Sequence, residues 1–196
     1  MIDQKLKRTL GQMMHAVQVV GAASADGTNR NLYCSHWVMQ VSFEEPIVMA
    51  SVSPKHDTYA HIASTGLFSV SILAGDQIAE GQYFSYPGRR FHQLAGEFVE
   101  DFDGLPVVAN AIGYLRCEVE DRKMLGDHEL FFARVTATRE GRLKAPPLLY
   151  SSRMGWRISG EKARDPGVSI RDQLLERLAA AGFDAGSDND NDADAE

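Results

Sequence analysis

The chain has 196 residues, of which 44% are hydrophobic and 24% charged, so it is long enough to bury a core. Six acids and no base lie within residues 184–196, and without them the net charge rises from −7 to about −1. This near-neutral body argues against nucleic-acid binding through a basic face. No apolar run approaches the roughly 20 residues that cross a bilayer, so we also expect no membrane association.

The chain has two cysteines, Cys34 and Cys117, and no CxxC pair. The N-terminal segment MIDQKLKRTLGQMM is amphipathic and lacks the continuous apolar region of a secretory signal. We therefore expect a cytoplasmic protein with reduced thiols.

The first part of the chain alternates short elements with turn signals. Leucine and methionine recur at helical spacing over residues 2–14, which predicts an amphipathic helix. Small and β-branched residues predict a strand over 16–24, and the Asp-Gly pair within 25–29 predicts a hairpin turn. A second strand is expected over 30–34.

A central strand and a helix follow. Residues 47–53 are apolar enough to form a buried strand, which begins after Pro46 because proline cannot donate to a ladder. Asp57 is the expected N-cap of the next helix, and Gly66 is expected to end it. Apolar residues then alternate with serine over 67–73, the pattern of a half-buried strand.

The second half is also rich in strand signals. In order, we predict a helix over 76–84, an irregular excursion over 85–91, strands over 110–124 and 129–139 with a tight turn at 125–128, an extended segment over 146–158, and a helix over 168–181. The expected fold is mainly β with helices, antiparallel, and a small barrel or curled sheet. The expected organisation is one domain over 1–160, a C-terminal helix within 161–183 and a disordered acidic tail over 184–196.

One candidate site lies where the strand over 47–53 meets the following helix. Ser51, Ser53, Lys55 and Thr58 combine hydroxyls and a cation with a helix N-terminus, an arrangement that can hold a phosphate. In the simpler alternative, Asp57 only caps the helix and the serines belong to an ordinary turn.

A second candidate is the loop with Ser35, His36, Trp37, Gln40 and Ser42, whose polar groups could bind the edge of a flat heterocycle, with Trp37 and Phe43 as its walls. The alternative is an edge-strand loop with Trp37 packed in the core.

Two single residues complete the candidates. His128, in the turn Gly126-Asp127-His128, could bind an anion or steer a substrate, or it could be an ordinary surface histidine. Cys34 is either a nucleophile or a small buried residue. The sequence has no GxGxxG after a strand and no P-loop motif.

Taken together and in order, these segments resemble the flavin reductase-like family of FMN-binding split β-barrel proteins, which includes flavin reductases and flavoredoxins. The resemblance covers roughly residues 10–158. It is carried by the segments VQVVGAASADG, CSHWVMQVSFEEP, IVMASVSPKHDTYAHI, GLFSVSILAGDQ, YLRCEVED, GDHELFFARV and PPLLYSSRMGWRI.

The resemblance implies roles for these residues. The isoalloxazine ring would be lined by Cys34, Ser35, His36, Trp37 and Gln40. The ribityl chain and 5′-phosphate would be held by Ser51, Ser53, Lys55 and Thr58. His128 would lie where a nicotinamide stacks on the flavin, with Tyr150 near the site. The cofactor would be FMN, with FAD possible as a substrate, and the protein would be a homodimer with the cofactor near its interface.

The expected function is therefore FMN-dependent oxidoreduction, with hydride passing from NADH or NADPH to the flavin. Two alternatives remain open: a flavoredoxin-like electron carrier for a protein partner, and a non-catalytic barrel that binds haem or another cofactor. The chain departs from the family pattern at Glu45-Pro46, at Ala133-Arg134 and at Lys55-His56-Asp57, which replaces a serine-rich loop.

Overall fold

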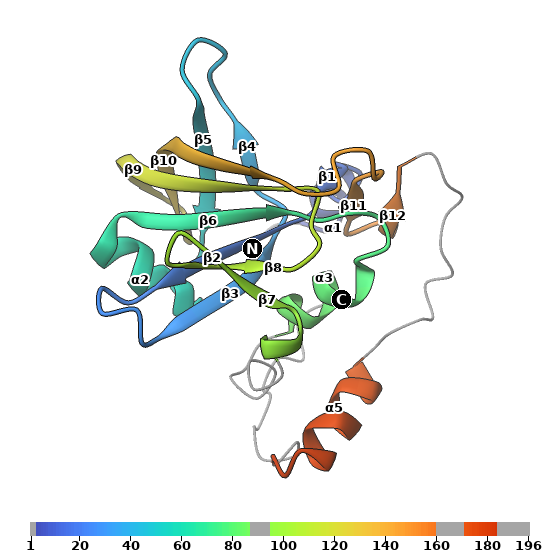
Figure 1. Cartoon of the computed structure of the whole chain (residues 1–196). Coiled ribbons are helices and arrows are strands. Elements are labelled where there is room, and N and C mark those ends of the chain that lie inside the picture. The colour runs from blue at the N-terminus through green and yellow to red at the C-terminus, as the bar shows by residue number, and fades with distance from the viewer. Residues whose placement is uncertain (1–2, 87–94, 160–170, 184–196) are drawn as a thin grey trace.

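One curled antiparallel sheet, flanked by helices and two small sheets, forms the body of the protein (Figure 1). The computed structural model describes residues 3–86, 95–159 and 171–183. The helices are α1 (Gln4–Leu10), α2 (Asp57–Thr65), α3 (Ile78–Ser85), the 3₁₀ turn η1 (Ala95–Glu97) and α5 (Arg171–Ala180). The strands are β1 (His15–Ala16), β2 (Gln18–Ala23), β3 (Arg30–Ser35), β4 (Val38–Gln40), β5 (Ile47–Val52), β6 (Leu67–Ile72), β7 (Val99–Phe102), β8 (Leu105–Val108), β9 (Gly113–Leu125), β10 (His128–Glu140), β11 (Leu148–Ser151) and β12 (Gly155–Ile158).

The main sheet curls because its two edge strands are neighbours in the chain. Its strand order is β3-β2-β6-β9-β10-β5-β4, and only His36 and Trp37 separate β3 from β4. Such a short link can join opposite edges only if the sheet rolls until those edges meet. Across the seam, the side-chain amide of Gln18 lies 3.5 Å from the Val38 carbonyl oxygen. The predicted antiparallel, curled, mainly β fold is confirmed.

Two hydrophobic cores lie on the two faces of this sheet. The inner core fills the curl and includes Val20, Phe68 and Phe131, all fully buried. The outer core packs the other face against α3, β8 and β11, with Val19 and Tyr83 among its buried members. A strand between two cores is buried on both faces.

The strand β6 shows this double burial and corrects one expectation. Its alternating serines suggested a half-buried strand, but Ser69 and Ser71 are both fully buried. Ser69 donates to the carbonyls of Pro106 and Gly21, and Ser71 accepts a hydrogen bond from the Val108 amide. The serines therefore bond to the main chain of neighbouring strands instead of facing water.

Other boundaries differ from the predictions in ways that local chemistry explains. Asp3 caps α1 by accepting from the Leu6 amide at 2.8 Å, and Gly11 ends this helix earlier than expected. The N-cap of α2 is His56, so the prediction of Asp57 was wrong by one residue, and Asp57 opens the first turn. Gly66 ends α2 in the left-handed conformation, as predicted.

Several short elements carried too weak a pattern to be predicted. The strand β4 and the hairpin of β7 and β8 have only three or four residues each, and tertiary pairing defines them. The C-terminal helix prediction overlaps α5, whose Leu178 is buried. The predicted tail over 184–196 and most of the predicted excursion over 85–91 lie outside the described residues. No helix in the described residues is long and apolar enough to cross a membrane.

A polar network ties α2 to the long hairpin of β9 and β10. The Arg122 guanidinium donates to both carboxylate oxygens of Glu129 at 2.7 Å, and the Tyr59 hydroxyl donates to Glu129 at 2.6 Å. Glu129 is 6% exposed, so its charge depends on these partners. The network fixes the position of α2, and with it the first turn of that helix.

Replacing Glu129 by Gln is expected to lower the free energy of unfolding by about 1–3 kcal/mol, because a charged pair of hydrogen bonds is lost. Hydrogen bonds from Arg122 hold the pKa of Glu129 below its ordinary value. The stabilisation is therefore complete above the ordinary carboxyl pKa and is lost as pH falls through the lower, folded-state pKa. Urea unfolding of wild type and variant at several pH values measures the difference.

The control is Glu118→Gln on the exposed side of β9, which is expected to change stability by less than about 0.5 kcal/mol. An equal loss in the free energy of unfolding for the two variants would contradict this role of Glu129. So would a difference between wild type and Glu129→Gln that does not shrink in acid.

Candidate functional site

The C-terminal end of β5 brings together residues from three distant parts of the sequence. On one side, the Ser51 amide donates to the Trp37 carbonyl at 3.0 Å. On the other, the register pairs Val52 with Glu129, so Ser53 follows beside His128. The Trp37 and His128 rings form a T-shaped contact, with centroids 5.0 Å apart and planes at 71°. Ser51, Ser53, Trp37 and His128 therefore meet at one end of the barrel.

Charged groups surround His128 at the turn between β9 and β10. Gly126 has φ +65°, a conformation that the tight turn requires and that side chains disfavour. Nδ1 of His128 lies 2.8 Å from Oδ1 of Asp127. This contact, with a smaller contribution from Lys55, lowers the pKa of Asp127. Lys55 is thus close enough to the turn to interact with its charge.

The loop from β5 into α2 is shaped by Ser53. Its Oγ accepts from the Lys55 amide at 3.3 Å, and its carbonyl accepts from the His56 amide at 3.0 Å. Thr58 is 1% exposed in the first turn of α2. His56 provides no side-chain hydrogen bond to cap this helix. The positive end of the helix dipole and the Lys55 cation therefore lie on one loop and favour an anion there, whereas the Asp57 carboxylate in the same turn opposes it.

A buried tyrosine lies behind this loop. The Tyr33 and His56 rings stack with centroids 4.3 Å apart and planes at 20°. Tyr33 is 6% exposed, and its buried hydroxyl makes no hydrogen bond of good geometry with any described residue. Burial raises the pKa of Tyr33, so the hydroxyl keeps its proton. The Ser35 side chain interacts with this hydroxyl and partly offsets the rise in its pKa.

A second cluster joins the end of β3 to β11 and β12. The His36 ring stacks on Tyr150 with centroids 4.3 Å apart, and the His36 and Trp156 rings form a T-shaped contact with centroids 6.0 Å apart. Sγ of Cys34 lies 3.8 Å from Nε2 of His36. The Ser35 hydroxyl links this cluster to the first, because it accepts from the Trp37 amide at 3.2 Å.

The protonation of this second cluster follows from its burial. Burial, with a smaller effect of His15, lowers the pKa of His36 to about 4, so the ring is neutral. Burial also raises the pKa of Cys34 to about 12. A thiol of that pKa is a poor nucleophile, which favours the alternative that Cys34 is a small packing residue.

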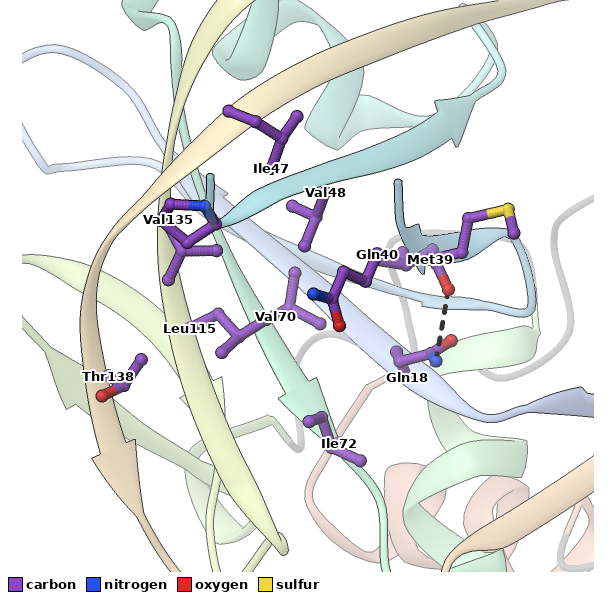
Figure 2. Close-up of a pocket in the computed structure, with 12 residues that line it drawn as sticks. Gln18, Met39, Gln40, Ile47, Val48, Val70, Ile72, Leu115, Val135 and Thr138 are labelled. Atoms are coloured by element: carbon purple, nitrogen blue, oxygen red, sulfur yellow. Dashed lines mark hydrogen bonds between the residues drawn. The ribbon is translucent and has the colours of Figure 1, made fainter. Parts of the chain in front are cut away.

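Gln40 lies apart from both clusters in the contacts it makes. Its side chain points into a hollow of about 410 Å³ on the concave side of the sheet, together with Val70, Leu115 and Val135 (Figure 2). Its amide donates to the Ser42 carbonyl at 2.8 Å. The structure thus gathers most of the predicted residues at the end of β5 or beside His36, and it places Gln40 at the hollow.

Sequence reasoning missed four residues at this end of the barrel. His56 and Asp127 flank predicted site residues, so their position was the available signal. Tyr33 and Trp156 had no signal, because only strand pairing and the curl bring them close. The structure also rejects the alternative in which Trp37 packs in the core, since this residue is 51% exposed.

Comparison with known sequences decides the family. Residues 10–156 match the family described as "Flavin reductase like domain". The chain belongs to the flavin reductase-like family. It is 32% identical over 152 residues to the NADH:riboflavin 5′-phosphate oxidoreductase of Streptomyces pristinaespiralis. The alignment covers 76% of this chain and 85% of that protein. The chain is also 31% identical over 136 residues to an NADH-dependent flavin reductase of Rhodococcus, over 66% of this chain and 73% of the relative.

Solved structures of this family share the fold. The NADH:FAD oxidoreductase SgcE6 of Streptomyces globisporus superposes with a TM-score of 0.70 at 20% identity, over 86% of this chain and 99% of its own. The styrene monooxygenase flavin reductase of Pseudomonas putida S12 superposes with a TM-score of 0.65 at 21% identity. This match covers 80% of this chain and 98% of that protein. The flavin reductase-like fold and the oxidoreductase class expected from the sequence are therefore confirmed.

Proposed function

We propose that this protein is an NAD(P)H-dependent flavin reductase that binds FMN at the end of β5. The observation that carries the proposal is the meeting of Trp37 and His128 on the two sides of this strand, beside the loop that opens α2. Flat, polar and cationic groups then face the same region. These are the groups that a flavin nucleotide needs, since it combines a flat ring with a phosphate.

The flavin ring lies against the link between β3 and β4 in this proposal. Ser35 holds the Trp37 amide, and Trp37 offers a half-exposed aromatic wall. The neutral His36, fixed by Tyr150, presents its ring nitrogens and not a positive charge. Cys34 packs behind them, and Gln40 lines the hollow farther along β4.

The phosphate lies on the loop from β5 into α2. Ser51 and Ser53 face the ribityl chain, while Lys55 and Thr58 hold the phosphate with the amides of the first turn. Once bound, the flavin supplies the hydride-accepting chemistry. The protein contributes position and a dry pocket wall. His128 orients the nicotinamide on the open face of the ring, and Asp127 fixes the His128 imidazole through Nδ1.

Purified protein tests this function directly. A yellow preparation, or one that takes up added FMN, with oxidation of NADH or NADPH when free FMN or FAD is supplied, is the expected result. Protein that retains flavin but oxidises neither nucleotide would point to an electron carrier. Protein that neither retains nor takes up flavin would contradict the proposal.

Replacing Thr58 by Val is expected to weaken FMN binding about tenfold, because a hydrogen bond to the charged phosphate is lost. Valine has nearly the volume of threonine, so packing at this buried position is kept. Riboflavin lacks the phosphate, and its affinity is expected to stay within about twofold. Flavin fluorescence titrations measure both, and equal losses for the two ligands would move Thr58 away from the phosphate.

Replacing His128 by Asn is expected to lower kcat/KM for the nicotinamide donor by about 10- to 100-fold, because the donor loses its positioning group. The dissociation constant of FMN is expected to change little. Steady-state kinetics and FMN titration separate the two effects. His61→Asn, on α2 and bonded to the Asn31 side chain, is the control and is expected to leave both unchanged. A loss of FMN affinity with normal donor kinetics would overturn this role.

We further propose a homodimer. The end of β4 and the loop that joins it to β5 project from the sheet as an arm (Figure 1). Met39, Val41 and Phe43 alternate along it and are 57%, 46% and 101% exposed. A second copy that covers these apolar side chains would explain their exposure. A molecular mass from sedimentation equilibrium that equals the mass of a single chain would contradict the homodimer.

The reduced flavin that such an enzyme releases must be used by another enzyme. Relatives include the reductase subunit of a flavin-dependent monooxygenase in Rhodococcus jostii and the reductase component of a 4-nitrophenol monooxygenase in Rhodococcus opacus. By analogy, we propose that this protein supplies reduced flavin to a partner oxygenase. Both cysteines are free thiols, which supports a reducing cytoplasm as its location.

A further inference from the structure

The position and exposure of His56 distinguish it from the other histidines near the site. It stands between Lys55 and the first turn of α2, next to the residues assigned to the flavin phosphate. Its ring is fixed on one face by the stacked Tyr33 ring at 4.3 Å. The residue as a whole is nevertheless exposed, whereas Tyr33 is buried. Because Tyr33 covers one face of the imidazole, the face opposite Tyr33 is the one that a further flat ring could reach.

This geometry is that of a pre-organised stacking surface. A flat ring that is already held in one orientation loses little entropy when a second flat ring packs on it. His56 provides no hydrogen bond to cap α2, so its side chain is not committed to the helix. Although the residue as a whole is exposed, its imidazole is partly buried, as by the stack on Tyr33. This desolvation and the nearby His128 lower the pKa of His56, with Asp57 opposing them, so the ring is largely uncharged at neutral pH. An uncharged aromatic ring stacks on a nucleobase through its π-face.

The ligand that fits this surface follows from what adjoins it. In FAD, an adenosine monophosphate group is attached to the phosphate of FMN, so the adenine must leave the site from the phosphate end. His56 is at that end. We propose that the open face of His56 stacks on the adenine ring of FAD, which makes this residue a determinant of the preference between FAD and FMN. The inference rests on the proposed flavin site and assigns the part of it that FMN does not use.

The test is the ratio of two dissociation constants, for FAD and for FMN, in wild type and variants. His56→Ala is expected to weaken FAD binding about tenfold, equivalent to about 1.4 kcal/mol, and FMN binding by less than about twofold. His56→Phe keeps a flat ring against Tyr33 and is expected to retain most of the FAD affinity. The control is His61→Ala, which removes an imidazole from the same helix. His61 bonds to the Asn31 side chain, and its loss is expected to leave the ratio unchanged.

Each other outcome decides against the inference. Equal losses of FAD and FMN in His56→Ala would show that His56 only supports the loop. Unchanged affinities would show that the stack on Tyr33 is packing alone. A raised KM for the nicotinamide donor with an unchanged FAD to FMN ratio would assign the surface to the donor. Failure of wild type to bind either flavin would instead refute the proposed function itself, so the two failures are distinguishable.

Discussion

The antiparallel pairing of β5 with strands on both sides is the constraint on which the site depends. β4 and β10 flank β5, and their register sets Trp37 next to Ser51 and His128 next to Ser53. A slip of one residue in either ladder would turn the corresponding side chains to the other face of the sheet. The hydrophobic inner core prevents such a slip, because Val48, Ala50 and Val52 are buried. Core packing and site geometry are thus determined by the same pairings.

The loop that opens α2 has a second support. The Glu129 network holds α2 against β9 and β10, and His128 immediately precedes Glu129 in the chain. One short segment of β10 therefore fixes both the helix and the histidine. The proposed phosphate loop and the proposed donor-binding side are tied to one rigid element. A site built this way needs few dedicated catalytic groups, since a bound flavin carries the hydride chemistry and the protein supplies position.

The sequence predicted most of this arrangement where local chemistry determines it. The strand over 47–53, the glycine end of α2 and the long hairpin all carry strong periodic or turn signals. Local pattern could not show that Ser69 and Ser71 are buried, because their partners lie on distant strands. It could not place His56 on Tyr33 either, since the two meet only through the curl of the sheet. Related proteins share such long-range geometry, so the family resemblance could predict that these loops come together.

The central claim is that three loops, at residues 35–38, 53–58 and 126–128, form one ligand site. Hydrogen exchange of the backbone amides, measured with and without saturating FMN, tests it most directly. Slower exchange in all three loops together is the predicted result, since a flavin bound there would cover them at once. Protection confined to the concave hollow around Met39, Leu115 and Val135, with the three loops unchanged, would contradict it.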